Sequence, residues 1–169
     1  MKRLLVAVAM VTLLASIGVA QQKKQYDVPG VFSFSYDDGW SKGPRKGGSN
    51  LELDWLVSTA DPTASFHAVL ARADFSYDDW IKRMIKAATP ERALVSKGDF
   101  DSASGEKGYK LVWKIKAQDG KEFVNDQYLY RGKGNSQVLL SGTVDAANAE
   151  KFGPVFDSFA KSFKITQAK

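Results

Sequence analysis

Cysteine is absent from the 169 residues of this chain, and histidine occurs only once. Without a thiol, the chain forms no disulfide, no zinc site of the cysteine type and no thiol nucleophile. A single imidazole also excludes the metal sites that several histidines build in hydrolases. The apolar core must therefore supply the stability that disulfides give to many small exported domains.

Sequence motifs of catalysis are missing as well. No Gly-x-Ser-x-Gly elbow is present, and Gly132-Lys133-Gly134 lacks the neighbours of a phosphate-binding loop, so it predicts a hairpin turn. His67 lies between apolar residues in a predicted strand, with no activated nucleophile beside it. The sequence therefore predicts no catalytic residue and no enzyme, and a hydrolase is the least favoured class.

The N-terminus has the pattern of a secretory signal. A positive start is followed by an almost entirely apolar stretch, and the small residues Gly18 and Ala20 precede a polar segment. The apolar stretch is shorter than the about 20 residues that a membrane-spanning helix needs. We expect residues 1–20 to be a signal peptide cleaved near Ala20, which predicts a periplasmic or secreted protein without a transmembrane segment.

The positive charge of the chain is smaller once the signal is removed. The full sequence has 24 basic and 19 acidic residues. The signal contains Lys2 and Arg3, so 22 basic residues remain against 19 acidic ones, a net charge of +3. This small excess, together with export, argues against a nucleic-acid partner.

One domain is expected over residues 26–166, after a polar lead-in at 21–25 without regular structure. Alternation of apolar and polar residues predicts strands at 31–36, 51–57, 66–71, 109–115, 123–130 and 137–144, with a shorter one at 91–100.

Ser76 is expected to cap a first helix, and an apolar stripe predicts a last helix whose regular part begins near Pro154. A short edge strand at 162–165 is expected to close the chain. The prediction is an α+β fold with a central antiparallel sheet flanked by helices.

One candidate contact surface is a basic, glycine-rich segment. Lys42, Arg45 and Lys46 lie in the loop expected at 41–50, directly after Trp40. The indole of Trp40 is expected either to seal the edge of the sheet or to anchor a partner. The three cations are read either as the contact with a protein or membrane-associated complex, or as a solvated loop.

A second candidate is a set of carboxylates. Asp99, Asp101 and Glu106 could gather around a hard cation such as calcium or manganese. The spacing of the twelve-residue calcium loop is missing, so solvated surface charge is the competing interpretation. Apart from such a cation, no cofactor is expected. A small-ligand or metal carrier is therefore the alternative to a docking module.

Both ends of the domain carry a family pattern. Residues Gly30 to Trp40, GVFSFSYDDGW, resemble the opening strand, turn and tryptophan of the PsbP-like and Mog-like superfamily, with Asp37 or Asp38 where that family has proline. Residues Phe156 to Ile165, FDSFAKSFKI, are similar to its last helix running into a Ser-Phe strand. The resemblance covers about residues 26–166.

This resemblance implies an α/β/α sandwich around an antiparallel sheet. It also implies a role in binding and assembly, since members serve as extrinsic photosystem II subunits, periplasmic DcrB-type proteins, secretion chaperones or GTPase-binding proteins. Export excludes the last of these roles. The function expected from the sequence is a non-enzymatic exported module that docks onto a protein or membrane complex.

Overall fold

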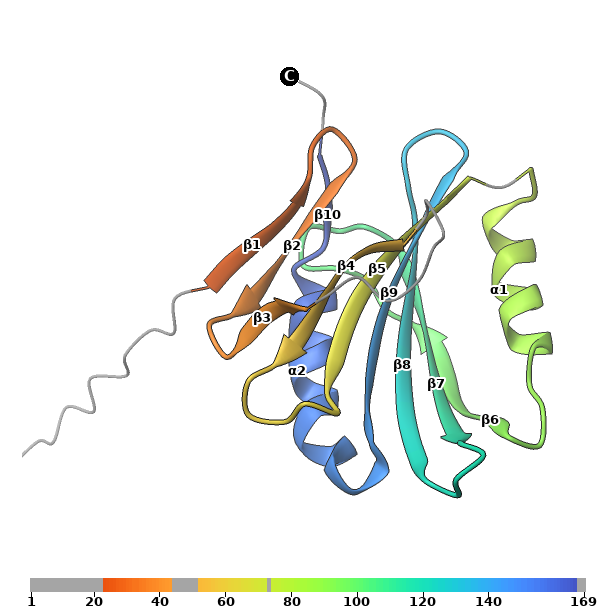
Figure 1. The fold of residues 1–169 in the computed structure, drawn as a ribbon. Coiled ribbons are helices and arrows are strands. Elements are labelled where there is room, and N and C mark those ends of the chain that lie inside the picture. The colour runs from red at the N-terminus through yellow and green to blue at the C-terminus, as the bar shows by residue number, and fades with distance from the viewer. Residues whose placement is uncertain (1–22, 44–51, 73, 167–169) are drawn as a thin grey trace, which may run out of the picture.

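The computed structural model describes residues 23–43, 52–72 and 74–166, with the side chains of 52–54 left out (Figure 1). In chain order the elements are β1 (Lys23–Val28), β2 (Phe32–Asp37), β3 (Trp40–Gly43), β4 (Glu52–Ser58), β5 (Ser65–Arg72), α1 (Tyr77–Lys86), β6 (Arg92–Asp99), β7 (Gly108–Lys116), β8 (Glu122–Arg131), β9 (Ser136–Asp145), the short η1 (Ala146–Asn148), α2 (Ala149–Lys161) and β10 (Lys164–Ile165).

The strands form two antiparallel sheets. The large sheet has the order β3-β4-β5-β9-β8-β7-β6, and the small one has the order β1-β2-β10. The α+β class, the meander from β6 to β9 and the closing strand β10 are thus confirmed. The expected lead-in is wrong for Lys23–Gln25, because these polar residues pair with β2 at the edge of the small sheet.

Helix α2 buries its aromatic stripe against both sheets. Its buried positions include Phe152, Phe156 and Phe159, and these join Phe34 of β2 and Phe66 of β5 in one core cluster. The helix begins at Ala149, five residues before the start expected at Pro154. Pro154 stands inside this helix, on its exposed side.

The closest approach between α2 and the large sheet is at Gly142 of β9. A Cβ atom added there would lie 2.4 Å from the ring of Phe156. Only a residue without a side chain lets the phenylalanine ring rest on the strand at this distance. Gly142 therefore sets the separation between α2 and the sheet.

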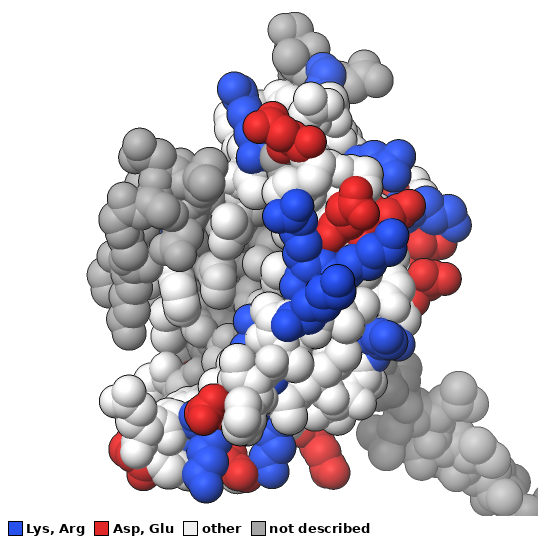
Figure 2. All heavy atoms as spheres, turned by 90° about the vertical axis from the view of Figure 1, so that its right-hand side faces the viewer, with Lys and Arg blue, Asp and Glu red and all other residues white. Residues whose placement is uncertain are grey.

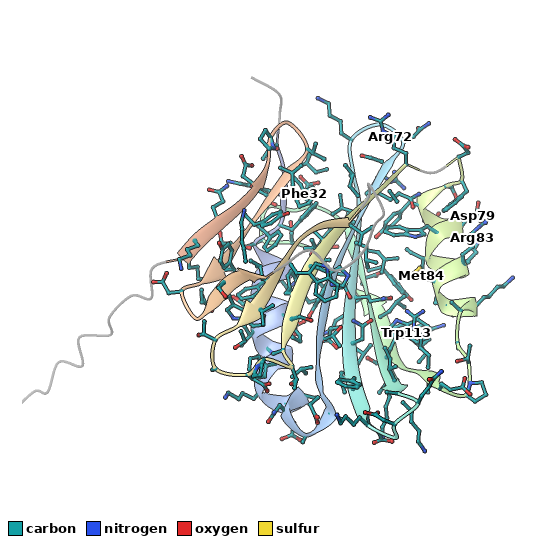
Figure 3. All side chains as sticks on the ribbon, viewed as in Figure 1. Phe32, Arg72, Asp79, Arg83, Met84 and Trp113 are labelled. Atoms are coloured by element: carbon teal, nitrogen blue, oxygen red, sulfur yellow. The ribbon has the colours of Figure 1, made fainter. Side chains whose placement is uncertain are left out.

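Helix α1 packs on the opposite face of the large sheet. Ser76 caps it as expected, since its Oγ accepts a hydrogen bond of 3.1 Å from the Asp79 amide. Trp80 and Met84 join Trp113 in a second cluster. Figure 3 shows Met84 pointing from α1 toward the sheet, while Asp79 and Arg83 lie on the outer side.

Alternation along β8 separates the two faces. Tyr128 and Tyr130 belong to the α2 cluster, and Leu129 between them belongs to the α1 cluster. All three side chains are fully buried. The large sheet is therefore covered on both faces around the centre of β8.

We expect Gly142→Ala to lower the free energy of unfolding by about 1–3 kcal/mol, because the new methyl group would force the Phe156 ring away from β9. Gly98→Ala is the matched control, since it also changes a strand glycine of the large sheet and a Cβ there meets no atom within 4 Å. Urea unfolding of both variants checks the expectation. Equal effects of the two substitutions would contradict it.

Candidate functional site

The structure places Trp40 in the core. Its side chain is 4% exposed, and its ring centroid lies 5.2 Å from that of Phe159 and 6.0 Å from that of Phe156. Of the two roles expected for Trp40, the structure shows the one that seals the edge of the sheet. The other expectation, that its indole contacts a partner, is corrected, because the indole is buried. Packing against the aromatic stripe of α2 is more favourable for this indole than exposure to solvent.

Of the three cations that follow Trp40, one lies within the described residues. Lys42 belongs to β3, and its Nζ lies 5.4 Å from the ring centroid of Tyr26. Arg45 and Lys46 lie outside the described residues. Their contact with a partner stays a prediction.

Two of the three acidic candidates engage groups of the protein. Asp101 pairs with Lys107, whose hydrogen bond is the main reason that the pKa of Asp101 is lowered. Glu106 Oε1 accepts a hydrogen bond of 3.4 Å from the Ile165 amide. Within residues 23–43, 52–72 and 74–166, no three histidine or acidic side chains are placed to hold a metal ion. The calcium or manganese site expected at Asp99, Asp101 and Glu106 is therefore corrected.

A different charged cluster lies where α2 meets the large sheet. Its members are Lys110 of β7, Asp126 and Tyr128 of β8, and Asp157 of α2. Lys110 is paired with Tyr128 across the ladder, and Asp126 is two residues before Tyr128 on the same face. Asp157 follows Phe156 on the helix, so the packing of that ring brings its carboxylate to the sheet.

Close contacts join the four side chains. The Nζ of Lys110 lies 2.7 Å from Asp157 Oδ1 and 3.0 Å from Asp126 Oδ2. The hydroxyl of Tyr128 donates to Asp157 Oδ1 at 2.6 Å and lies 3.4 Å from Asp126 Oδ2. One ammonium group thus bridges two carboxylates, and the tyrosine hydroxyl contacts both of them.

Burial shifts the protonation of this cluster. The Asp126 side chain is 6% exposed, and loss of solvent raises its pKa, although Lys110 acts in the opposite direction. The pKa of Tyr128 is raised as well, first by burial and then by the two carboxylates. The tyrosine therefore stays protonated and acts as a donor.

A cleft of about 290 Å³ opens beside this cluster, between α2 and strands β7 to β9. Its apolar lining is Val112, Val124, Val144, Ala149 and Phe156. Lys110, Asp126, Glu150 and Gly153 also line the cleft. The cleft combines an apolar floor with a buried carboxylate, which is the composition of a binding site.

The sequence reasoning missed this cluster. Its one local signal is the polar run Asn125-Asp126-Gln127 in the middle of an otherwise apolar strand. The opposing charges come from β7 and α2, and Lys110 and Asp157 are 47 positions apart. Only the packing of the helix on the sheet brings them together.

The other face of the sheet carries a neutral polar row. Asn125 donates to Ser141 Oγ at 2.8 Å, and the indole of Trp113 donates to Gln127 Oε1 at 2.9 Å. His67 stacks on Trp55 with ring centroids 4.3 Å apart. Burial lowers the pKa of His67 to about 4, so this imidazole is neutral at physiological pH.

Comparison with known proteins shows which solved structures have a similar fold. No family model matches the chain, and no curated protein does. CyanoP, the cyanobacterial PsbP of Synechocystis sp. PCC 6803, matches 89% of this chain and 96% of its own with a TM-score of 0.63 and 16% identity.

This chain has the PsbP-like fold. LpqN of Mycobacterium tuberculosis, which is involved in cell envelope biogenesis, matches 87% of this chain and 92% of its own with a TM-score of 0.64 and 15% identity. A protein of unknown function from Pseudomonas aeruginosa matches 87% of this chain and 99% of its own with a TM-score of 0.56 and 15% identity. The PsbP-like and Mog-like resemblance is thereby confirmed at the level of the fold.

No helix within the described residues is long and apolar enough to cross a membrane.

We expect Asp126→Asn to change the free energy of unfolding, relative to wild type, more favourably at about pH 7 than near pH 4. The raised pKa means that the folded chain holds a proton that the unfolded chain has already lost. The stabilisation by that proton is present below the unfolded pKa of 3.8 and is lost as pH rises through the folded pKa. Urea unfolding of wild type and variant at both pH values measures the difference.

Asp119→Asn provides the opposite case, because a backbone hydrogen bond from Lys121 lowers the pKa of Asp119. The stabilising effect of the Asp119 carboxylate is lost as pH falls, so this variant should be relatively more favourable near pH 4. If both substitutions showed the same sign of pH dependence, the assignment of a raised pKa to Asp126 would be wrong.

A second pH effect is expected from His67. Its pKa falls from 6.5 to about 4 on folding, so its contribution is complete above the unfolded value and is lost as pH decreases toward 4. A shift of this size corresponds to roughly 3 kcal/mol. His67→Phe and His67→Gln should both flatten the acid side of the stability profile in urea unfolding. Unchanged profiles in both variants would show that other groups dominate it.

Proposed function

We propose that this chain is an exported, non-enzymatic accessory module that docks onto another protein of the cell envelope, alone or within a membrane-associated complex. The cleft beside α2 is the observation that carries the proposal. It joins partly exposed apolar side chains to a buried carboxylate on one surface. Protein interfaces of this composition combine an apolar centre with a few oriented polar groups.

The fold is consistent with this proposal. LpqN has the same fold and is involved in cell envelope biogenesis, and CyanoP is a cyanobacterial PsbP. In the proposed three-layer α/β/α arrangement, α1 and α2 form the outer layers. The signal pattern of residues 1–20 would bring the chain to the periplasm or outside the cell.

The cleft lies where α2 stops covering the sheet. The helix packs against β2, β8 and β9. Val112 of β7, the next strand of the sheet, lines the cleft. The side chains of Val112 and Val124 are partly exposed. A partner segment lying along α2 would cover them and continue the burial that the helix begins.

A photo-crosslinking experiment in the native host tests the proposal. The amino acid p-benzoylphenylalanine replaces Val112 at the cleft or, as a control, Lys86 on the exposed side of α1. We expect a discrete crosslinked adduct larger than the chain from position 112 and none of that mass from position 86. Identical adduct patterns at the two positions, or no adduct at either, would rule out docking at the cleft.

The basic segment is a second proposed contact. Lys42, Arg45 and Lys46 would add electrostatic attraction to an acidic partner surface. Reversing the three charges to glutamate should weaken recovery of the crosslinked partner and leave the melting temperature nearly unchanged. Recovery at the wild-type level would remove the segment from the interface.

A small-ligand carrier is the second candidate function, because the cleft has a buried carboxylate in an apolar lining. Its volume of about 290 Å³ is at the lower limit of small-molecule pockets, which usually measure roughly 300–1,000 Å³. Native mass spectrometry of the protein purified from its host distinguishes the two functions. A bound small molecule that Asp126→Asn releases would favour the carrier.

A further inference from the structure

We infer that the cleft between α2 and strands β7 to β9 receives a basic side chain, lysine or arginine, presented by the docked protein. This inference rests on the proposed function and specifies what the docking surface recognises. Three features of the cleft support it: its charge, an oxygen of its buried carboxylate that can accept a further hydrogen bond, and the shape and chemistry of its walls.

The charge around the cleft is negative. Among the lining residues, Asp126 and Glu150 supply two carboxylates and Lys110 the one cation, which also pairs with Asp157 beside the cleft. Without Lys2 and Arg3 of the signal, the chain has 22 basic and 19 acidic residues, a net charge of +3. Lysine and arginine gather on the α1 side of the molecule (Figure 2), which is the opposite face of the large sheet from the cleft. The cleft is thus an acidic site on a basic protein and attracts a cation.

The Asp126 carboxylate has capacity for a further bond. Within the part of the chain that the structure describes, its contacts with Lys110 and Tyr128 are both made by Oδ2. Lys110 also pairs with Asp157 at 2.7 Å, so its single charge is shared between two carboxylates. Oδ1 of Asp126 is therefore the acceptor left for an incoming donor. One shared cation only partly offsets the cost of burying the Asp126 carboxylate.

The walls suit the stem of a long basic side chain. Val112, Val124 and Val144 from three adjacent strands face Phe156 of α2 across the cleft. Lysine and arginine bury their methylene groups against apolar surface while the charged end finds an acceptor. Gly153 lines the helix side, and a Cβ there would lie 4.0 Å from Asp126 Oδ2, an ordinary contact distance. A volume of about 290 Å³ accommodates one such side chain.

The inference is tested with minimal probes and the ¹⁵N-labelled processed protein. N-Butylguanidinium and n-butylamine imitate the two basic side chains, and butyrate and n-butanol are the anionic and neutral controls. We expect the two cations to shift the backbone amides of residues 124–128 and 149–156 in a saturable way, and the controls to leave them in place. Equal shifts with butyrate would overturn the inference.

Variants assign the contact to Asp126. Asp126→Asn should weaken binding of N-butylguanidinium by about tenfold or more, because it removes the buried acceptor charge. Asp101→Asn is the matched control, since Asp101 pairs with Lys107 away from the cleft, and binding should be unchanged. Glu150→Gln changes an exposed lining residue and should weaken binding to a smaller degree, which keeps a test available if the Asn variant fails to fold. Wild-type affinity in both cleft variants would overturn the inference.

The outcomes separate this inference from the proposed function. If position 112 crosslinks to a foreign protein and the cations do not bind, docking stands and recognition of a basic side chain fails. If the cations bind and no protein is crosslinked, the cleft is a site for a free cation and the docking proposal fails. An adduct of twice the mass of the chain would identify a second copy as the occupant and overturn the assignment of a foreign partner.

Discussion

The contact between the Phe156 ring and the bare backbone of Gly142 determines where the proposed binding residues lie. This contact sets the distance between α2 and the large sheet. Gly142 is paired with Asp126 on the neighbouring strand, and Asp157 follows Phe156 on the helix. One close approach therefore places the core ring and the two carboxylates of the cluster together. The cleft opens directly beside it, where the helix no longer covers the sheet.

A cluster of this kind contributes little to stability compared with an apolar core of the same volume. Removing two carboxylates and an ammonium group from water costs free energy, and their mutual attraction only partly offsets that cost. The raised pKa of Asp126 is the direct sign of this cost. Elsewhere the α2 interface is built mainly from aromatic side chains in stacked and edge-to-face contacts, which need no such charges. This contrast is why we place the binding chemistry at the cluster rather than at other parts of the core.

The two faces of the large sheet differ in character. The α1 face holds tryptophans and a satisfied polar row, in which Asn125, Gln127 and Ser141 bond to one another or to their neighbours. The α2 face holds the charged cluster and the open cleft.

The sequence by itself determined most elements of the fold, because apolar alternation and helical spacing are local properties. Phe32 and Phe34 predict β2, and Ser76 predicts the start of α1. The lead-in and the start of α2 were misjudged, since pairing with β2 stabilises a polar strand and packing of Phe152 extends the helix before Pro154. Only the tertiary structure decided the proposed binding site. Lys110, Asp126 and Asp157 stand on three different elements, and no local pattern encodes which charges meet when a helix packs on a sheet.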